Sequence, residues 1–475
     1  MCSRAAAGIT RLAVRGLYEG GKLPARLKAI YASGEFASSI VFGALSLVFA
    51  SYFLIEVAGL RPLLAGLVPL AGRGLDAFTD PLMGRISDGT RWKSGRRRPY
   101  FLIGALPFGL SFALLWTDPG QIPEAGRFAY YTLAYCLMTT SSTVLVIPYM
   151  ALQAEMATGY HERNSINGYR SAAGMVGVMA AVGMRPLAEV FGGGGEGFAR
   201  AGMLLGVVLT LPWFAAYRVS FERPSFGNRR VQLGLVEGFR VLGRHANFRR
   251  LVGLYLSGRV AIDLCSAMLV IYCTYWLGQT ERFEQFMLVF LLAVVASMPL
   301  LLKIAGRRNK ASMFTWAAIW WALVQSLLVL AQPDWPAWVM FVHAPLLAFG
   351  FAATEFLPWS MVGDVVDEDD LLTGERREGL YNGVFTFLRK LSGALAVFLA
   401  LGLLDFAGLE AGRQQQPQTL WAVRLLTGVG PGIFLLLAAW FARGYTISQA
   451  AHEDLVQKLR ARDGQPGRGG VDSVQ

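Results

Sequence analysis

The chain has 475 residues, of which 54% are hydrophobic and only 16% are charged. Soluble globular domains carry about 25% charged residues, and four cysteines are too few for a disulfide scaffold. This composition excludes a disordered chain, a disulfide scaffold and an ordinary soluble enzyme. The net charge of +12 indicates either a nucleic-acid-binding surface or the charged cytoplasmic loops of a membrane protein.

Apolar runs long enough to cross a bilayer follow one another along most of the chain. A spanning helix needs about 20 mostly apolar residues, and twelve such runs occur, six on each side of a basic stretch at 218–250. The expected spans are, in chain order, 29–55, 62–84, 99–117, 129–152, 168–190, 201–217, 251–277, 285–305, 313–331, 336–362, 380–404 and 419–442. The predicted fold is an all-α polytopic membrane protein with twelve transmembrane helices.

The positions of the basic residues indicate an orientation for these spans. If both termini are cytoplasmic, 32 of the 44 Lys and Arg residues fall in the inside segments and only five in the outside loops. Cytoplasmic loops of membrane proteins are enriched in Lys and Arg in this way. The excess of positive charge therefore labels topology, and nucleic acid is excluded as a partner. We expect an integral protein of a bacterial inner membrane with both termini in the cytoplasm.

A short pattern recurs after the fourth and the tenth expected span. Pro148-Tyr149 and Pro358-Trp359 are 210 residues apart, and an acidic residue, basic residues and an Asn-Gly pair follow in each half. This recurrence predicts two pseudo-symmetric six-helix bundles that rock around a central site. The expected organisation is a cytoplasmic N-terminal segment at 1–28, an N-terminal bundle at 29–217, a central cytoplasmic loop at 218–250, a C-terminal bundle at 251–442 and a cytoplasmic tail at 443–475.

Charged residues inside a span cost about 2.5–3.5 kcal/mol each on insertion scales, so they mark candidate sites. In the second span, Asp76 and Asp80 are spaced i and i+4, which places both carboxylates on one helical face. Carboxylates this close repel each other unless a cation or a proton lies between them. The pair indicates a site for Na⁺ or H⁺; alternatively, Asp76 pairs with Arg73 and Asp80 lies near the cytoplasmic interface.

Three other spans carry charges. Arg259 and Asp263 in the seventh span form either a self-neutralising pair within the helix or contacts for a substrate. In the eleventh span, Lys390 is expected to face the central cavity, with Arg389 about 100° away around the helix. Arg170, at the start of the fifth span, either reaches the cavity or joins a network of loop residues.

Further candidates lie near the ends of the expected cavity. Glu35 and Glu355 are weaker candidates of the same kind, whereas Arg185 is expected to snorkel from a helix end. The rings of Tyr149 and Trp359 either face lipid or the membrane interface, as most aromatic residues of such a chain do, or stack on a ligand. The sequence shows no local pattern of metal ligands and no nucleophile–base motif, so neither a metal, nor a catalytic residue, nor a cofactor is expected beyond a coupling ion.

The stretch from Arg73 to Pro99 resembles a signature of the glycoside–pentoside–hexuronide:cation symporters of the major facilitator superfamily. The most specific part is Asp76-Ala-Phe-Thr-Asp80-Pro81. The resemblance extends over nearly the whole chain and includes Pro148-Tyr149. It implies the major facilitator fold and secondary active transport by alternating access, rather than an enzyme.

The resemblance assigns roles to single residues. In the sodium-coupled melibiose permeases of that family, two aspartates of the second span bind the cation, and polar side chains join them. The expected cation-binding residues are Asp76, Asp80, Thr79 and Thr143. An arginine of span 5 and a lysine of span 11 line the cavity in that family. These two positions are matched by Arg170 and Lys390. Together with the charged and aromatic candidates named above, the expected substrate-binding residues are Arg170, Lys390, Tyr149, Asp263, Arg259 and Trp359.

The loop after the second span also resembles the general loop 2–3 motif of the superfamily. Gly84 would let helices approach closely, and Asp88 with the arginine run would form charge contacts that lock the cytoplasmic side in one state. The residues expected to form this conformational gate are Gly84, Asp88, Gly95, Arg96, Arg97, Arg98, Glu155, Arg163 and Asp364.

The substrate is the least determined feature. Melibiose permeases carry aspartates for sugar in spans 1 and 4, where this chain has Ser38-Ser39 and Val146. The segment Cys273–Gly278 is also similar to the eukaryotic sodium-dependent lysophosphatidylcholine symporters, where a span-11 lysine, matched by Lys390, meets the phosphate. A sugar, glycoside or related solute is the first expectation and a lysophospholipid the alternative. A membrane-embedded enzyme or a non-transporting receptor is a remote alternative. The protein is expected to be a monomer among membrane lipids.

Overall fold

The computed structural model describes residues 22–157, 160–222, 243, 245–305, 309–336, 338–374 and 378–463. Within these residues the chain is helical and forms no β-strand, apart from an isolated bridge between Trp92 and Gly95. Most of the predicted central loop and the outer parts of both predicted terminal segments lie outside the described residues.

The helices fall into two sets in chain order. The first set consists of α2 (Ala25–Ala44) continued by η1 (Leu45–Val57), α3 (Pro62–Gly89), α4 (Pro99–Leu115), α5 (Glu124–Met156), α6 (Tyr160–Ala181) followed by α7 (Met184–Val190), and α8 (Gly194–Val208) followed by α9 (Leu211–Val219). The second set consists of α11 (Ala246–Ile271) continued by η3 (Tyr272–Trp276), α12 (Arg282–Ala305), α13 (Lys310–Ser326) continued by η4 (Leu327–Val329), α14 (Trp338–Thr373), α15 (Glu378–Phe406), α16 (Pro417–Arg443) and the tail helix α17 (Gln449–Asp463).

Helices occupy all twelve expected span positions in the described part of the chain. Nine of them are long and apolar enough to cross a membrane, and α6 with α7 makes a tenth if this bent pair is one span. Helix α4 is apolar but has only 17 residues, and α3 carries Arg73, Asp76 and Asp80 near its centre. The chain is therefore an all-helical membrane protein, whereas the count of twelve crossings stays a prediction.

The helix boundaries follow from local signals. Pro62 and Pro417 begin α3 and α16, because the fixed φ of proline suits the first turn of a helix. The side chain of Asn309 accepts a hydrogen bond from the Ala311 amide and caps α13. A bend of 44° separates α6 from α7 at Gly183. This bend changes the direction of the fifth span just before Arg185.

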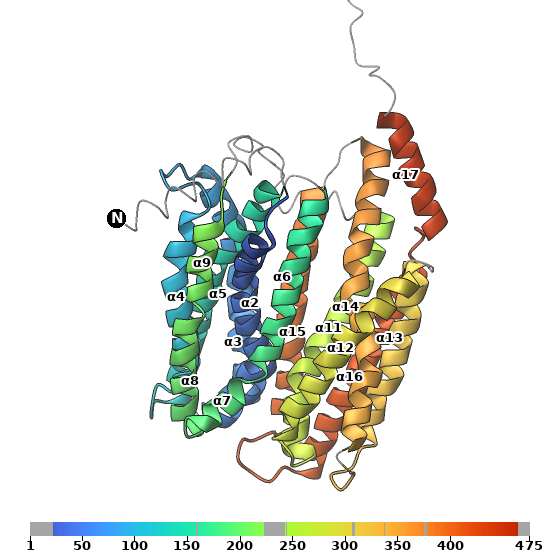
Figure 1. Cartoon of the computed structure of the whole chain (residues 1–475). Helices are drawn as coiled ribbons and strands as arrows, with labels where there is room; N and C mark the ends of the chain where they lie inside the picture. The colour runs from blue at the N-terminus through green and yellow to red at the C-terminus, as the bar shows by residue number, and fades with distance from the viewer. Residues whose placement is uncertain are drawn as a thin grey trace, which may run out of the picture.

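The two sets of helices form two bundles that lie side by side (Figure 1). In the first, α2 packs on α6, and α4 packs on α5 and α8; in the second, α11 and α13 pack on α16, and α12 packs on α14. The bundles meet mainly where α3 contacts α15 and where η1 contacts α11. We call the end at which α2 begins, α16 ends and α17 lies the tail end, and the other the opposite end.

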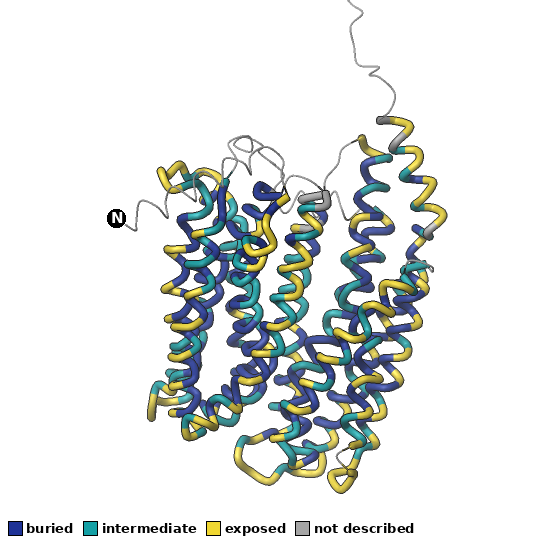
Figure 2. The backbone as a smooth tube through the Cα atoms, in the orientation of Figure 1, coloured by how far each residue is buried: buried dark blue, intermediate teal, exposed yellow. Residues whose placement is uncertain are grey.

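The distribution of exposed side chains fits a lipid environment. Large apolar residues such as Trp316 and Phe406 are 72% and 93% exposed. Figure 2 shows exposed residues along the outer faces of both bundles and buried residues between the helices. Such extensive apolar exposure is unusual in soluble proteins and normal where the outer surface contacts acyl chains.

Glycines allow the helices to approach closely at particular points. A Cβ atom at Gly109 on α4 would overlap the carbonyl oxygen of Gly206 on α8. Between the bundles, a Cβ atom at Gly66 on α3 would lie 2.9 Å from the Cα atom of Phe398 on α15. Small residues of this kind are common at helix contacts in membranes, because they maximise van der Waals packing.

We expect Gly109→Ala to destabilise the first bundle, because the added methyl group must push the backbone of α8 away. Overpacking of this kind costs about 1–3 kcal/mol, so the thermal unfolding midpoint of the purified protein should fall by several degrees. Gly363→Ala on α14 is the matched control, because no atom lies within 4 Å of its Cβ position. Equal midpoints for both variants would contradict the tight α4–α8 contact.

Candidate functional site

A cluster of ionised side chains joins α3 of the first bundle to α15 of the second. Lys390 Nζ lies 2.5 Å from Asp80 Oδ2 and 3.4 Å from Asp76 Oδ2. Arg73 contacts Asp76 at 3.1 Å, and Thr143 of α5 donates a hydrogen bond of 2.7 Å to Asp80. The i, i+4 spacing of the aspartates brings both carboxylates to the lysine. The pair of Asp76 with Arg73 therefore exists, and it does not prevent Asp76 from sharing a cation site with Asp80.

The cluster has the ligands that a small cation needs. Asp76 is 3% exposed, and its Oδ1 atom accepts no hydrogen bond within the described structure. Leaving a buried acceptor unsatisfied costs about 1–3 kcal/mol or more, which a bound cation would offset. Thr79 lies outside the cluster in this conformation, because its hydroxyl donates to the Leu75 carbonyl of its own helix. The oxygen donors that the cluster assembles therefore belong to Asp76, Asp80 and Thr143.

A second charged cluster lies within the C-terminal bundle. Arg259 and Asp263 form the intrahelical pair, with Nε 2.8 Å from Oδ2. Arg259 also contacts Glu355 of α14 at 3.1 Å, and Arg389 reaches the same carboxylate at 3.5 Å. A Cβ atom at Gly393 would overlap the Asp263 carboxylate, so α15 passes directly over this side chain. Arg389 therefore points into its own bundle, whereas its neighbour Lys390 points to the first.

A third cluster lies within the N-terminal bundle. Arg170 of α6 donates to Glu35 of α2 through Nε at 3.0 Å and also to the side-chain oxygen of Gln153. Gln153 in turn donates to Asn167 at 2.5 Å. The Arg170 guanidinium lies 4.8 Å from the ring centre of Tyr149. Arg170 thus joins a side-chain network of α2, α5 and α6, in which Glu35 is its direct ion-pair partner.

The two predicted stacking aromatics are packed into the bundles. Tyr149 is 1% exposed, stacks on Tyr31 with ring centres 4.4 Å apart, and donates its hydroxyl to the Tyr31 carbonyl. Trp359 packs edge-on against Tyr255 and Phe385. The expectation of a ligand-stacking Tyr149 is wrong for this conformation, because the ring already fills the space between α2 and α5. Trp359 belongs to an aromatic cluster of the second bundle.

The arginine run after α3 binds acidic residues at the tail end of the first bundle. Arg97 contacts Asp88 at 2.6 Å and Glu155 of α5 at 2.5 Å, and Arg96 also binds Glu155. Glu155 is only 3% exposed. The predicted charge contacts of Asp88 with the arginines therefore exist, and they connect α3, α5 and the loop between α3 and α4.

A second carboxylate, absent from the expectations, holds the backbone of this loop. Glu222, which follows α9, accepts hydrogen bonds of 2.7 Å from the Arg96 and Arg97 amides. Gly95 has φ of +120°, and a Cβ atom there would lie 2.7 Å from Glu222. Glycine is required at this point for both the backbone angle and the close approach. Arg98 donates to the Tyr217 carbonyl and lies 4.9 Å from the ring centre of Tyr217.

Three further predicted gate residues have separate surroundings. Gly84 makes no close helix contact in this conformation, because its Cβ position meets only Ile147 at 4.0 Å. Arg163 donates to the Ala157 carbonyl at 2.8 Å, within the turn between α5 and α6. Asp364 of α14 binds Lys310 at 2.8 Å, and His452 of α17 lies 3.5 Å from it. Asp364 thus anchors the tail helix and the start of α13 in the second bundle.

Sequence reasoning missed a second link between the bundles, at the opposite end. Arg185 of α7 is 5% exposed and binds Glu284 of α12, with Nη2 2.9 Å from Oε2. The hydroxyl of Tyr275 on η3 donates to Glu56 on η1 nearby. The snorkelling expected for Arg185 is therefore wrong, because its guanidinium is buried in an ion pair across the two halves. Glu284, directly before the expected span 285–305 and in the first turn of α12, was the available signal.

Comparison with known proteins identifies a transporter family and symporters that are similar to this chain. The model of a family described as MFS/sugar transport protein matches residues 30–449. The putative glycoside/cation symporter YagG of Escherichia coli is 27% identical, with 90% of this chain and 93% of YagG covered. The sodium-dependent lysophosphatidylcholine symporter 1-A of Danio rerio is 26% identical, with 85% of this chain and 82% of that protein covered.

The fold has solved counterparts. One solved structure comes from work on substrate recognition in proton-dependent oligopeptide transporters. It superposes on this chain with a TM-score of 0.67 at 13% identity, and the match covers 91% of this chain and 99% of that one. At this identity the likeness shows the fold alone. It confirms the predicted all-helical fold.

We expect the loss of the Arg185–Glu284 pair to loosen the opposite end. In Glu284→Gln the buried guanidinium loses its charged partner, which costs about 3–5 kcal/mol in known cases. Cys273 on η3 is fully buried, and its carbonyl accepts a hydrogen bond from the amide of Gln279, directly before Thr280, whose carbonyl accepts one from Arg185. Its labelling by maleimide, measured with the other cysteines replaced by serine, should accelerate about tenfold or more.

The matched control for this experiment is Glu410→Gln, which breaks the exposed Arg413–Glu410 pair within one bundle. This control should leave the labelling rate unchanged. The double variant Arg185→Glu with Glu284→Arg should restore slow labelling. Rates that are equal in all variants would overturn the assignment of this pair as the closure of the opposite end.

Proposed function

Because this chain belongs to the family described as MFS/sugar transport protein, and is therefore a membrane transporter and not an enzyme, we propose that it couples the symport of an organic solute to a cation bound at Asp76 and Asp80. The observation that carries the proposal is the ion cluster between α3 and α15. Lys390 occupies the position between two carboxylates in which a coupling cation would lie. The coupling ion is Na⁺ or H⁺.

The cluster links cation binding to the relative position of the bundles. Lys390 belongs to the second bundle and the aspartates to the first, so the lysine is a cation whose position depends on conformation. A bound Na⁺ or a proton would neutralise the aspartates in its place and release α15 from α3. Since the two kinds of neutralisation compete, any movement that withdraws the lysine raises the affinity for the cation, and the cation favours that movement in return.

The orientation follows from the basic residues. We place the tail end in the cytoplasm of a bacterial cell, with the protein in the inner membrane as a monomer, because Lys and Arg concentrate at this end. The Arg185–Glu284 pair and the Tyr275–Glu56 contact then lie at the outer end. With this orientation the two contacts would hold the outer ends of the bundles together.

A sugar, a glycoside or a related polar solute is the substrate that we propose first. The network of Glu35, Arg170 and Gln153 offers charged and amide groups that can bind hydroxyls. Glu35 is partly exposed, so this network is accessible in part. The similarity to a protein named as a putative glycoside/cation symporter supports the same choice.

One observation favours a lysophospholipid as the second candidate. Arg389 is 39% exposed and makes only a long contact of 3.5 Å with Glu355, and Lys390 beside it is 28% exposed. Each of these cations can bind a phosphate group on its own side of α15. The similarity to a protein named as a sodium-dependent lysophosphatidylcholine symporter supports this alternative.

We expect Asp80→Asn to abolish cation-dependent uptake, because it removes one carboxylate and leaves Lys390 poorly neutralised. Uptake into proteoliposomes should fall by about tenfold or more, because the variant loses an interaction with the cation on which coupled transport depends. Asp334→Asn, in an exposed loop, is the matched control and should transport normally. Uptake by Asp80→Asn that still responds to a Na⁺ or H⁺ gradient would refute the proposed cation site.

The two substrate classes predict different thermal shifts. A bound ligand stabilises a folded protein by mass action, by about 2.7 kcal/mol at one hundred times the dissociation constant. Glycosides should raise the unfolding midpoint in wild type and Arg389→Gln alike, but not in Arg170→Gln. If lysophosphatidylcholine is the substrate, it should raise the midpoint in wild type and fail to do so in Arg389→Gln. Either shift should grow when Na⁺ is added if Na⁺ is the coupling ion.

A further inference from the structure

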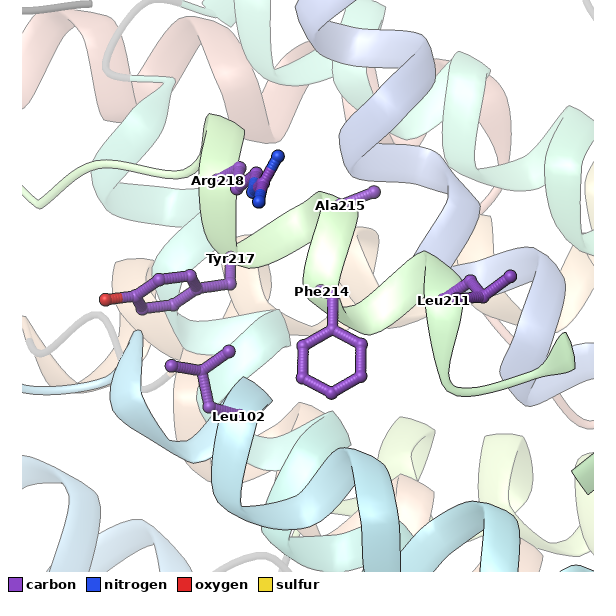
Figure 3. Close-up of a pocket in the computed structure, with 6 residues that line it drawn as sticks. All are labelled: Leu102, Leu211, Phe214, Ala215, Tyr217 and Arg218. Carbon is purple, nitrogen blue, oxygen red and sulfur yellow. The ribbon is translucent and has the colours of Figure 1, made fainter. Parts of the chain in front are cut away.

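A groove on the outer face of the first bundle lies between α4 and α9, near the tail end. Its volume is about 460 Å³, and it is lined by Leu102, Leu211, Phe214, Ala215, Tyr217 and Arg218. Figure 3 shows Leu102 on α4 facing Phe214 and Tyr217 of α9, with Arg218 at the end of α9 remote from Leu211. The walls are apolar and one end is cationic.

A second groove lies at the corresponding place on the other bundle, between α13 and α16. Its volume is about 390 Å³, and Thr315, Trp316 and Ile319 of α13 form one wall. Asn309 and Ser312 contribute polar groups at the tail end, and Arg443 lines the groove from the last turn of α16. Trp316 is 72% exposed on the outer face of the bundle.

The two grooves occupy equivalent positions in the repeat. Helices α4 and α9 belong to the third and sixth expected spans of the first half, and α13 and α16 to the third and sixth of the second. In each half an arginine stands in the last turn of the sixth span, Arg218 in α9 and Arg443 in α16. The same combination of an apolar groove and a terminal arginine thus arises twice.

These two arginines are available for a ligand. Both are exposed, and neither forms an ion pair with another described residue, although many other arginines of the chain do. Each stands where the apolar outer surface ends at the tail end, which with the proposed orientation is the depth of lipid headgroups. An arginine there can bind a phosphate bidentately, while the groove below accepts an acyl chain.

We propose that each groove binds one anionic phospholipid of the leaflet at the tail end. The phosphate lies at Arg218 or Arg443, and an acyl chain lies along Phe214 and Leu102 in the first groove and along Ile319 and Trp316 in the second. Charge complementarity selects an anionic headgroup. The apolar walls select a lipid over free phosphate.

The grooves adjoin the residues that hold the tail end of each bundle. Tyr217 lies under Arg98, which belongs to the same loop as the arginines that bind Glu155. In the second bundle, Asn309 precedes Lys310, which binds Asp364. A lipid in the first groove would therefore lie beside the loop that carries predicted gate residues, and a lipid in the second beside Lys310, which binds the predicted gate residue Asp364.

The test is native mass spectrometry of the full-length protein released from membranes of defined lipids. Wild type should retain two molecules of phosphatidylglycerol and little phosphatidylcholine with the same acyl chains. Arg218→Gln and Arg443→Gln should each retain one, and the double variant none. Arg249→Gln, which removes an exposed arginine at the tail end of α11, lines neither groove and should retain both.

Further variants and probes distinguish a bound phospholipid from a bound inorganic anion. Ala215→Trp keeps the charge of Arg218 but fills the first groove, so it should also lose one lipid. Each variant should keep the thermal unfolding midpoint of wild type in detergent without lipid, and inorganic phosphate should not raise it. Equal retention of both phospholipids, retention of phosphatidylglycerol by the double variant, or stabilisation by phosphate alone would overturn the proposal.

Discussion

Two carboxylates in the middle of α3, Asp76 buried and Asp80 partly exposed, are the constraint on which the arrangement of the two halves depends. Asp76 and Asp80 cannot both stay ionised in an apolar environment without cations close to them. Arg73 supplies one cation from the same helix, and Lys390 supplies the other from the opposite bundle. Since the second cation belongs to the other half, neutralising the site also brings α15 against α3, where Gly66 permits close packing with Phe398. Electrostatics and helix packing therefore stabilise the same contact.

The second link between the halves has the same form and an equivalent place in the repeat. Lys390 joins the fifth helix position of the second bundle to the second position of the first. Arg185 joins the fifth position of the first bundle to Glu284 in the second position of the second. The two links differ in depth, because one lies near the middle of α3 and the other at the opposite end. Equivalent helices of the predicted repeat thus carry both links: the proposed ion site, and an ion pair in which both Glu284 oxygens accept hydrogen bonds from Arg185.

The residues that sequence could identify are those whose partners are close in the chain or whose spacing is diagnostic. The i, i+4 spacing of Asp76 and Asp80 and the arginine run after α3 are of this kind, and the structure places each among charged partners. Arg185 was misread because a lone arginine near a span end resembles a snorkelling residue, and Glu284 lies 99 residues away. Glu222 was missed because it accepts hydrogen bonds from backbone amides, and such contacts cannot be predicted from the pattern of side chains in the sequence. Tyr149 was misplaced because helical periodicity alone does not distinguish a face toward a cavity from a face toward a neighbouring helix.

The remaining polar networks explain why such a molecule can move as two bodies. Glu155 with Arg96 and Arg97, and Arg170 with Glu35, close within the first bundle. Arg259 with Glu355, and Asp364 with Lys310, close within the second. Each bundle therefore pairs these charges internally, so that a rocking motion would leave the pairs intact. The pairs that cross between the bundles would have to break. In the proposed mechanism a small cation at Asp76 and Asp80 replaces the lysine that leaves, which makes separation of the halves at this point depend on the ion.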